Sequence, residues 1–134
     1  MKRKGLERQR RYNQLIDNSA QLVSLEVYEG SVYYQEPFYQ LMRQTLWAEQ
    51  VVKHKKSERI KADDFWHLHI VPPANDSLLA CNYKVSGKGM EETWRSMLND
   101  QSKYSIVDPE DLFLPLCAKT DYITLIEYLK ARYW

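Results

Sequence analysis

The amphipathic segment at residues 31–52, SVYYQEPFYQLMRQTLWAEQVV, constrains the fold of this 134-residue chain more than any other stretch. Pro37 suits the first position of a helix, because the amide hydrogen that proline lacks would have no partner there. We therefore predict a helix from Pro37 to His54 whose apolar face packs on the rest of the protein. That face repeats at steps of three and four residues, and it carries Phe38, Leu41, Met42, Leu46 and Val52.

Polar side chains occupy the opposite face of this predicted helix. Gln40, Arg43 and Gln44 project from neighbouring turns, and their hydrogen-bond donors suit carboxylates, phosphates or bases. The same pattern also fits an ordinary solvated helix face, so the spacing alone leaves both interpretations open.

Length and composition fit one soluble domain. Hydrophobic residues make up 44% of the chain and charged residues 28%, which is ordinary for a globular protein. Because the formal net charge is only +1, the molecule as a whole does not attract nucleic acid, and only a local basic patch could bind it. The apolar runs are far shorter than the roughly 18 residues that a membrane-spanning helix needs. Because Cys81 and Cys117 lack ligand spacing, we expect a cytoplasmic protein with reduced, buried or half-buried thiols.

The strongest basic cluster lies at the N-terminus, where we predict a helix over residues 6–17. Such a cluster can neutralise the phosphates of a nucleic acid, although the ends of chains are often only solvated. DNA is therefore a candidate partner at this end of the chain. The cluster consists of Lys2, Arg3, Lys4, Arg8, Arg10 and Arg11.

Two segments predict β-strands with good support. Residues 65–71, FWHLHIV, are aromatic and β-branched and stop at two prolines, and their apolar character on both faces fits a strand covered by helices. Residues 104–107 predict the second strand, and residues 25–32 and 78–83 give weaker strand signals. Further helices are expected at residues 90–99, from Asp108-Pro109 to an early stop at Pro115, and from residue 120 to the end.

Two histidines, His67 and His69, share one face of the first predicted strand. An H-x-H pair can bind a metal ion, but no third ligand lies at a recognisable spacing. Packing or an interface is the better interpretation, since histidine is intermediate in burial. An enzyme with an unrecognised site at these histidines is the weakest functional alternative.

Alternating helices and strands predict an α/β layered fold that is rich in helix and has few strands. Two strands alone make a marginal sheet. We therefore expect an exposed apolar edge or face of the sheet, and either a partner chain or self-association to complete it.

Several blocks of sequence carry a family resemblance over most of residues 10–115. They are RYNQLIDNSAQL, YYQEPFYQLMRQTLWAEQ, HLHIVPPAND and MEETW. These blocks resemble the C-terminal half of a bacterial group of restriction endonucleases within the PD-(D/E)XK superfamily. The resemblance implies that residues 1–134 form a single domain, a partial restriction-endonuclease-like layer that is the C-terminal part of a larger nuclease-like domain.

Catalysis in that superfamily needs an acidic residue and a D/E-x-K triplet that hold Mg²⁺ and stabilise charge on the phosphate. In this chain no acid is followed two positions later by lysine. Glu58 and Lys61 are three positions apart, so on a strand they would point to opposite faces. We therefore expect a remnant or fragment of such an endonuclease that is inactive alone and has no cofactor. Mg²⁺ is expected only for a complete family member.

The resemblance also points to residues beside an active site. In related nucleases, the helix after the catalytic strands often supplies polar side chains that orient phosphates or carboxylates. The matching positions here are Gln40 and Arg43, and after them Gln44. The alternative is a non-catalytic module for nucleic acid or protein interaction, which would contact DNA through the N-terminal cluster and the KHKK run at residues 53–56.

Overall fold

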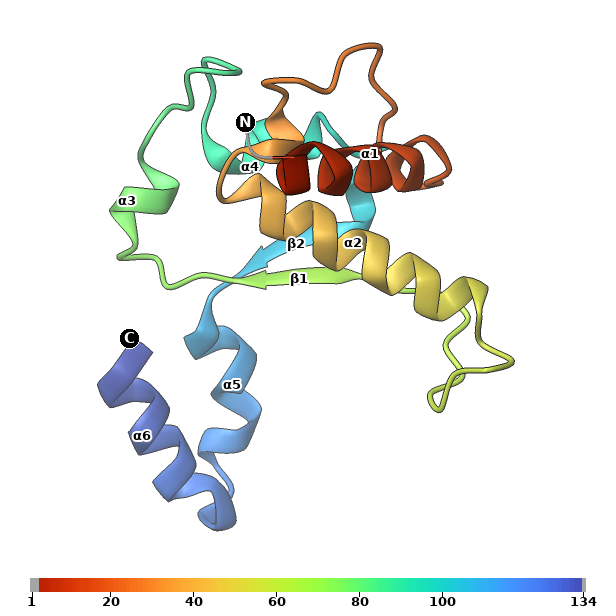
Figure 1. Cartoon of the computed structure of the whole chain (residues 1–134). Helices are drawn as coiled ribbons and strands as arrows, with labels where there is room; N and C mark the ends of the chain where they lie inside the picture. Colours follow the sequence, from red (N-terminus) through yellow and green to blue (C-terminus); the bar gives the residue numbers. More distant parts are fainter. Residues whose placement is uncertain (1–2, 134) are drawn as a thin grey trace.

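The computed structural model describes residues 3–133 of the chain (Figure 1). Short 3₁₀ turns at Val32–Tyr34, Gln101–Lys103 and Thr120–Tyr122 join the longer elements. The strands are β1 (His67–Ile70) and β2 (Tyr104–Val107). The α-helices are α1 (Arg3–Asp17), α2 (Phe38–Lys53), α3 (Asp76–Leu79), α4 (Met90–Arg95), α5 (Pro109–Cys117) and α6 (Ile123–Tyr133). The described residues thus form a helix-rich α/β fold with a small sheet, as predicted.

The helix α2 is the central element, and the hydrophobic core forms on its predicted apolar face. Phe38, Leu41, Met42 and Leu46 are all buried there. Pro37 is the N-cap of the helix and not its first residue, and the last helical residue is Lys53. The predicted helix is therefore confirmed, with each end shifted by one residue.

The indole of Trp94 on α4 lies in the middle of this core. Its ring centroid is 6.3 Å from that of Tyr33, 6.4 Å from that of Phe38 and 6.5 Å from that of Tyr104. The Tyr33 hydroxyl donates hydrogen bonds to the carbonyl oxygens of Val23 and Met97. The aromatic centre therefore connects α2, α4, β2 and the loop after α1.

The sheet pairs β1 and β2 in parallel, from His67 opposite Tyr104 to Ile70 opposite Val107. In Figure 1, α2 crosses one side of this sheet, while the hairpin of α5 and α6 extends from the end of β2 on the other side. Both strand predictions are confirmed, with β1 shorter than expected. The expectation that β1 is covered on both faces was wrong, because Leu68 and Ile70 remain 51% and 47% exposed.

Two weak strand predictions were also wrong. Of residues 25–32, those from 25 to 31 form a loop and Val32 begins a 3₁₀ turn; in the loop Gly30 takes a φ of 70° that favours glycine. Leu78 and Leu79 lie in α3, because the Asn75 side chain caps that helix by accepting from the Leu78 amide.

Helix lengths differ from prediction at two places. The helix α4 has six residues, because the chain turns after it and buries Met97 and Leu98 in the core. Pro115 lies inside α5, which continues to Cys117, since a proline removes one helical hydrogen bond without forcing the helix to end there. Cys81 and Cys117 are both exposed free thiols, so the expectation of buried thiols was wrong.

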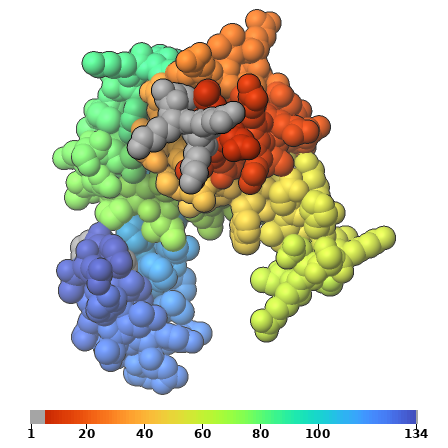
Figure 2. Space-filling model, viewed as in Figure 1, coloured from red at the N-terminus to blue at the C-terminus, as the bar shows by residue number. Residues whose placement is uncertain are grey.

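The hairpin of α5 and α6 lies beside the core and contributes little to it. Asp108 caps α5 by accepting a hydrogen bond from the Glu110 amide at 2.8 Å, which confirms the predicted helix start. Ile126 is buried within the hairpin, whereas Leu114 and Leu125 are exposed. Figure 2 shows this hairpin projecting from the rest of the molecule. None of the helices within residues 3–133 has the length and apolarity needed to cross a membrane.

Candidate nucleic-acid interface

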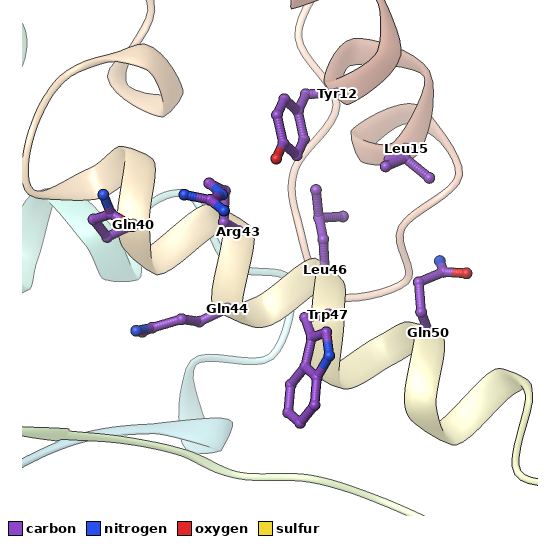
Figure 3. Close-up of a pocket in the computed structure, with 8 residues that line it drawn as sticks. All are labelled: Tyr12, Leu15, Gln40, Arg43, Gln44, Leu46, Trp47 and Gln50. Carbon is purple, nitrogen blue, oxygen red and sulfur yellow. The ribbon is translucent and has the colours of Figure 1, made fainter. Parts of the chain in front are cut away.

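A groove of about 430 Å³ runs between α1 and α2. Figure 3 shows Tyr12 and Leu15 entering it from α1. The helix α2 supplies the remaining lining residues, which are Gln40, Arg43, Gln44, Leu46, Trp47 and Gln50. The structure thus brings together the three polar residues of α2 that the sequence singled out, and it adds an apolar floor.

Arg43 is the cationic residue of this groove. Its guanidinium carbon lies 5.6 Å from the centre of the Tyr39 ring, so the side chain is held by a cation–π contact. Among the described residues no carboxylate forms an ion pair with it. The fork of N–H donors therefore remains available to an anion in the groove.

The two glutamines have different surroundings. Gln44 Oε1 accepts a hydrogen bond from Nε2 of His67 at 2.9 Å, which ties this side of the groove to β1. Gln40 is exposed one turn earlier on α2. Gln40 and Arg43 are therefore exposed to solvent on the α2 side of the groove, while Gln44 is also hydrogen-bonded to His67 of β1.

A second hollow continues this surface along α1. It is lined by Glu7, Arg8, Arg11, Tyr12 and Leu15, and the last two residues also line the first groove. Arg8, Arg11 and Arg43 therefore border one continuous surface.

The remaining members of the N-terminal cluster are not brought to this surface by the described structure. Arg10 follows Arg8 by two positions, which places it on a different side of the helix. Lys2 lies outside the described residues, as do the side chains of Arg3 and Lys4.

The family described as "Restriction Endonuclease associating with ARP" matches residues 1–134. The chain belongs to this family. No curated protein and no solved structure gives a significant match. The relationship to restriction endonucleases that the sequence blocks predicted is therefore confirmed at the level of the family.

The two acidic residues just before β1, Asp63 and Asp64, form ion pairs in this member of the restriction-endonuclease-related family. Asp63 pairs with Lys55, and Asp64 pairs with Lys103. The Lys103 hydrogen bond lowers the pKa of the Asp64 carboxyl. Within residues 3–133 no three His, Cys, Asp or Glu side chains lie close enough together to hold a metal ion.

The histidine pair faces the interior side of the sheet in this family member. His67 Nδ1 lies 3.3 Å from Thr45 Oγ1, and His69 Nδ1 lies 2.8 Å from the Tyr104 hydroxyl. Burial, with a smaller effect from His69, lowers the pKa of His67 to about 4, and burial also lowers the pKa of His69. Both rings are therefore neutral at pH 7, and they pack against α2 and β2.

Sequence reasoning missed Glu49, the residue that fixes the spacing of α1 and α2. This side chain is only 5% exposed, and its oxygens accept from the Ser19 hydroxyl at 2.6 Å and from the amides of Ala20 and Gln21 at 2.9 and 3.0 Å. The available signal was its position three residues after Leu46, on the buried face of α2. A carboxylate there needs donors from elsewhere in the chain.

Proposed function

We propose that this chain is a nuclease-related domain that binds DNA across the surface between α1 and α2. One observation carries this proposal. Arg8 and Arg11 on α1 and Arg43 on α2 come from separate helices and border one surface with a shared apolar lining of Tyr12 and Leu15.

The chemistry of this surface suits a phosphate backbone. Arginine forks form paired hydrogen bonds with phosphate oxygens, and each neutralised phosphate releases condensed counterions. Trp47 is 70% exposed at the other side of the groove, and an exposed indole can stack on a base. The net charge of +1 means that attraction would depend on this local surface and not on the whole molecule.

The finer assignment, to the C-terminal part of a PD-(D/E)XK domain, belongs to the same proposal. It is supported by the sequence blocks and by the order of a long helix, α2, followed by a core strand, β1. In this proposal the acid and the D/E-x-K triplet are not supplied by this chain, which therefore binds DNA without cutting it.

Binding is tested by the anisotropy of a labelled DNA duplex at several salt concentrations. Arg43→Gln and Arg11→Gln should each weaken binding and lower the slope of log K against log salt by about 0.9 for one lost phosphate contact. Arg10→Gln is the matched control, because it removes the same charge from α1 outside the lined surface. Equal losses in all three variants, or binding without salt dependence, would contradict the proposal.

Cutting is tested separately with supercoiled plasmid and Mg²⁺. We expect no nicking by this chain above a mock purification. Mg²⁺-dependent nicking that copurifies with the protein and changes on mutation of its residues would show that the chain holds a complete catalytic centre, and the non-cutting part of the proposal would then be wrong.

A further inference from the structure

The strand β1 has one unpaired edge. The Val71 amide donates to the Val107 carbonyl oxygen at 3.0 Å, which fixes the alternation of backbone groups along β1. Odd-numbered residues direct their N–H and C=O groups toward β2, so those of Leu68 and Ile70 point away from it. Within the described residues, no other strand pairs with this edge.

The unpaired edge is self-complementary. If two β1 strands run antiparallel and cross at Leu68, that residue lies opposite its own copy, and Trp66 lies opposite Ile70 of the second copy. Leu68 and Ile70 lie in β1 and share the outward backbone parity. Extending the strand by one residue on pairing gives Trp66 the same parity, and the register then closes about six backbone hydrogen bonds without a bulge. A register shifted by one residue would place inward-facing groups at the edge and lose these bonds.

Side chains on this edge also suit a second copy. Leu68 and Ile70 point to the outer face of the sheet and are 51% and 47% exposed, and Trp66, which directly precedes β1, is 63% exposed. Two copies would place six apolar side chains side by side. No charged residue lies between Phe65 and Val71, and the histidines are neutral at pH 7, so the strands would not repel one another.

A hollow of about 420 Å³ lies between α2 and the start of β1. It is lined by Gln44, Thr45, Trp47, Ala48, Phe65, Trp66, His67 and Leu68. Figure 3 shows Trp47 on the side of α2 away from Tyr12 and Leu15. An indole in that position contacts whatever lies along this edge.

We propose that two copies of this chain associate through antiparallel pairing of their β1 edges, with a two-fold axis at Leu68. The pairing turns two marginal two-stranded sheets into one four-stranded sheet in the order β2, β1, β1, β2. It satisfies the unpaired backbone groups and covers part of the outer apolar face. A two-fold dimer is a closed assembly, so both β1 edges are used and the two β2 strands lie at the outer edges of the sheet.

The register is tested by disulfide trapping in a Cys81→Ser, Cys117→Ser background. Leu68→Cys places two thiols on the two-fold axis with α-carbons about 5.5 Å apart, within the range of a disulfide. Oxidised Leu68→Cys should therefore run as a covalent dimer on non-reducing gels. Ile70→Cys is the matched control, because its two copies lie roughly 14 Å apart in this register and should not cross-link. Cross-linking of Ile70→Cys without Leu68→Cys would overturn the proposal.

Non-covalent association is tested by light scattering over a wide range of protein concentration. The unchanged chain should dimerise, and Leu68→Lys should be monomeric with an unchanged circular dichroism spectrum, since Leu68 is half exposed in the single copy. Leu125→Lys, which is similarly exposed on α6, should still dimerise. A monomeric unchanged chain, or a dimer lost in Leu125→Lys and kept in Leu68→Lys, would overturn the proposal.

Discussion

Individual residues on the buried face of α2 hold most of the core together. Leu41 and Met42 have almost no exposed surface, and truncating either leaves a cavity among large neighbours. We expect Leu41→Ala and Met42→Ala each to lower the free energy of unfolding by roughly 2–5 kcal/mol, measured by urea denaturation. Trp47→Ala on the opposite face is the control, and a loss below about 0.5 kcal/mol is expected there. A reversed order would mean that the buried face is assigned wrongly.

The carboxylate of Glu49 is a second residue on which the structure depends. Glu49→Ala leaves the amides of Ala20 and Gln21 without their acceptor. The expected cost is about 1–3 kcal/mol in the free energy of unfolding, because donors that lose a buried partner are not fully rehydrated. Glu26→Ala, at an exposed position, should change stability little. The same denaturation experiment tests both variants.

His67 gives stability a defined dependence on pH. Its pKa is about 4 in the folded protein, against 6.5 for an ordinary histidine in solvent, so the unfolded chain binds a proton more readily. The contribution of neutral His67 is therefore complete above pH 6.5 and is lost as the pH falls toward 4. We expect His67→Gln to flatten this part of the pH profile of unfolding, while His54→Gln, exposed at the end of α2, leaves it unchanged. Parallel profiles for all three proteins would contradict this assignment.

At the scale of elements, the helix α5 depends on its cap. Asp108 supplies the acceptor for the first turn. Asp108→Ala should cost about 1 kcal/mol of helix stability, seen as reduced helical circular dichroism and faster amide exchange in α5. Asp111→Ala removes an acid from the same turn without removing the cap, so it should have a smaller effect.

Elements with strong local signals were predictable from sequence, and those fixed by distant contacts were not. The helix α2 repeats its apolar face over sixteen residues, and β2 and the start of α5 have clear local patterns. The segment at residues 25–32 alternates like a strand, but none of the strands within residues 3–133 pairs with it, and the hydrogen bond from the Tyr33 hydroxyl to the Val23 carbonyl oxygen holds it as a loop. One face of β1 is exposed because no other element of the described chain covers it. Local sequence does not encode which elements cover a strand.

At the scale of the whole molecule, the core and the C-terminal hairpin are separate in packing. The central cluster of buried residues extends from Ile16 to Tyr104, with Ile106 packed against it, and includes nothing from α5 or α6. We therefore expect a chain ending at residue 108 to keep a cooperative thermal transition close to that of the full chain. Loss of that transition would show that the hairpin supports the core more than its buried contacts indicate.

The groove itself was only partly predictable. The spacing of Gln40, Arg43 and Gln44 placed them on one face of a helix, and the structure shows that face lining the groove. The packing of α1 across α2, which adds Tyr12 and two arginines, depends on contacts between distant residues such as Glu49 and the turn after α1. The orientation of α1 relative to α2 therefore cannot be predicted from any local sequence pattern.

The tryptophans that the structure describes divide by environment, and this gives the protein an optical readout. Trp94 is buried in the core, whereas Trp47 and Trp66 are exposed, one beside the groove and one beside the β1 edge. Acrylamide should therefore quench the emission of Trp47 and Trp66 and spare that of Trp94. In variants that keep a single indole, the emission wavelength and quenching of Trp66 would report on contact at the strand, and those of Trp94 on melting of the interior. Trp47 lines both the groove and the hollow beside β1, so its emission would respond to ligand in the groove and to pairing at the strand.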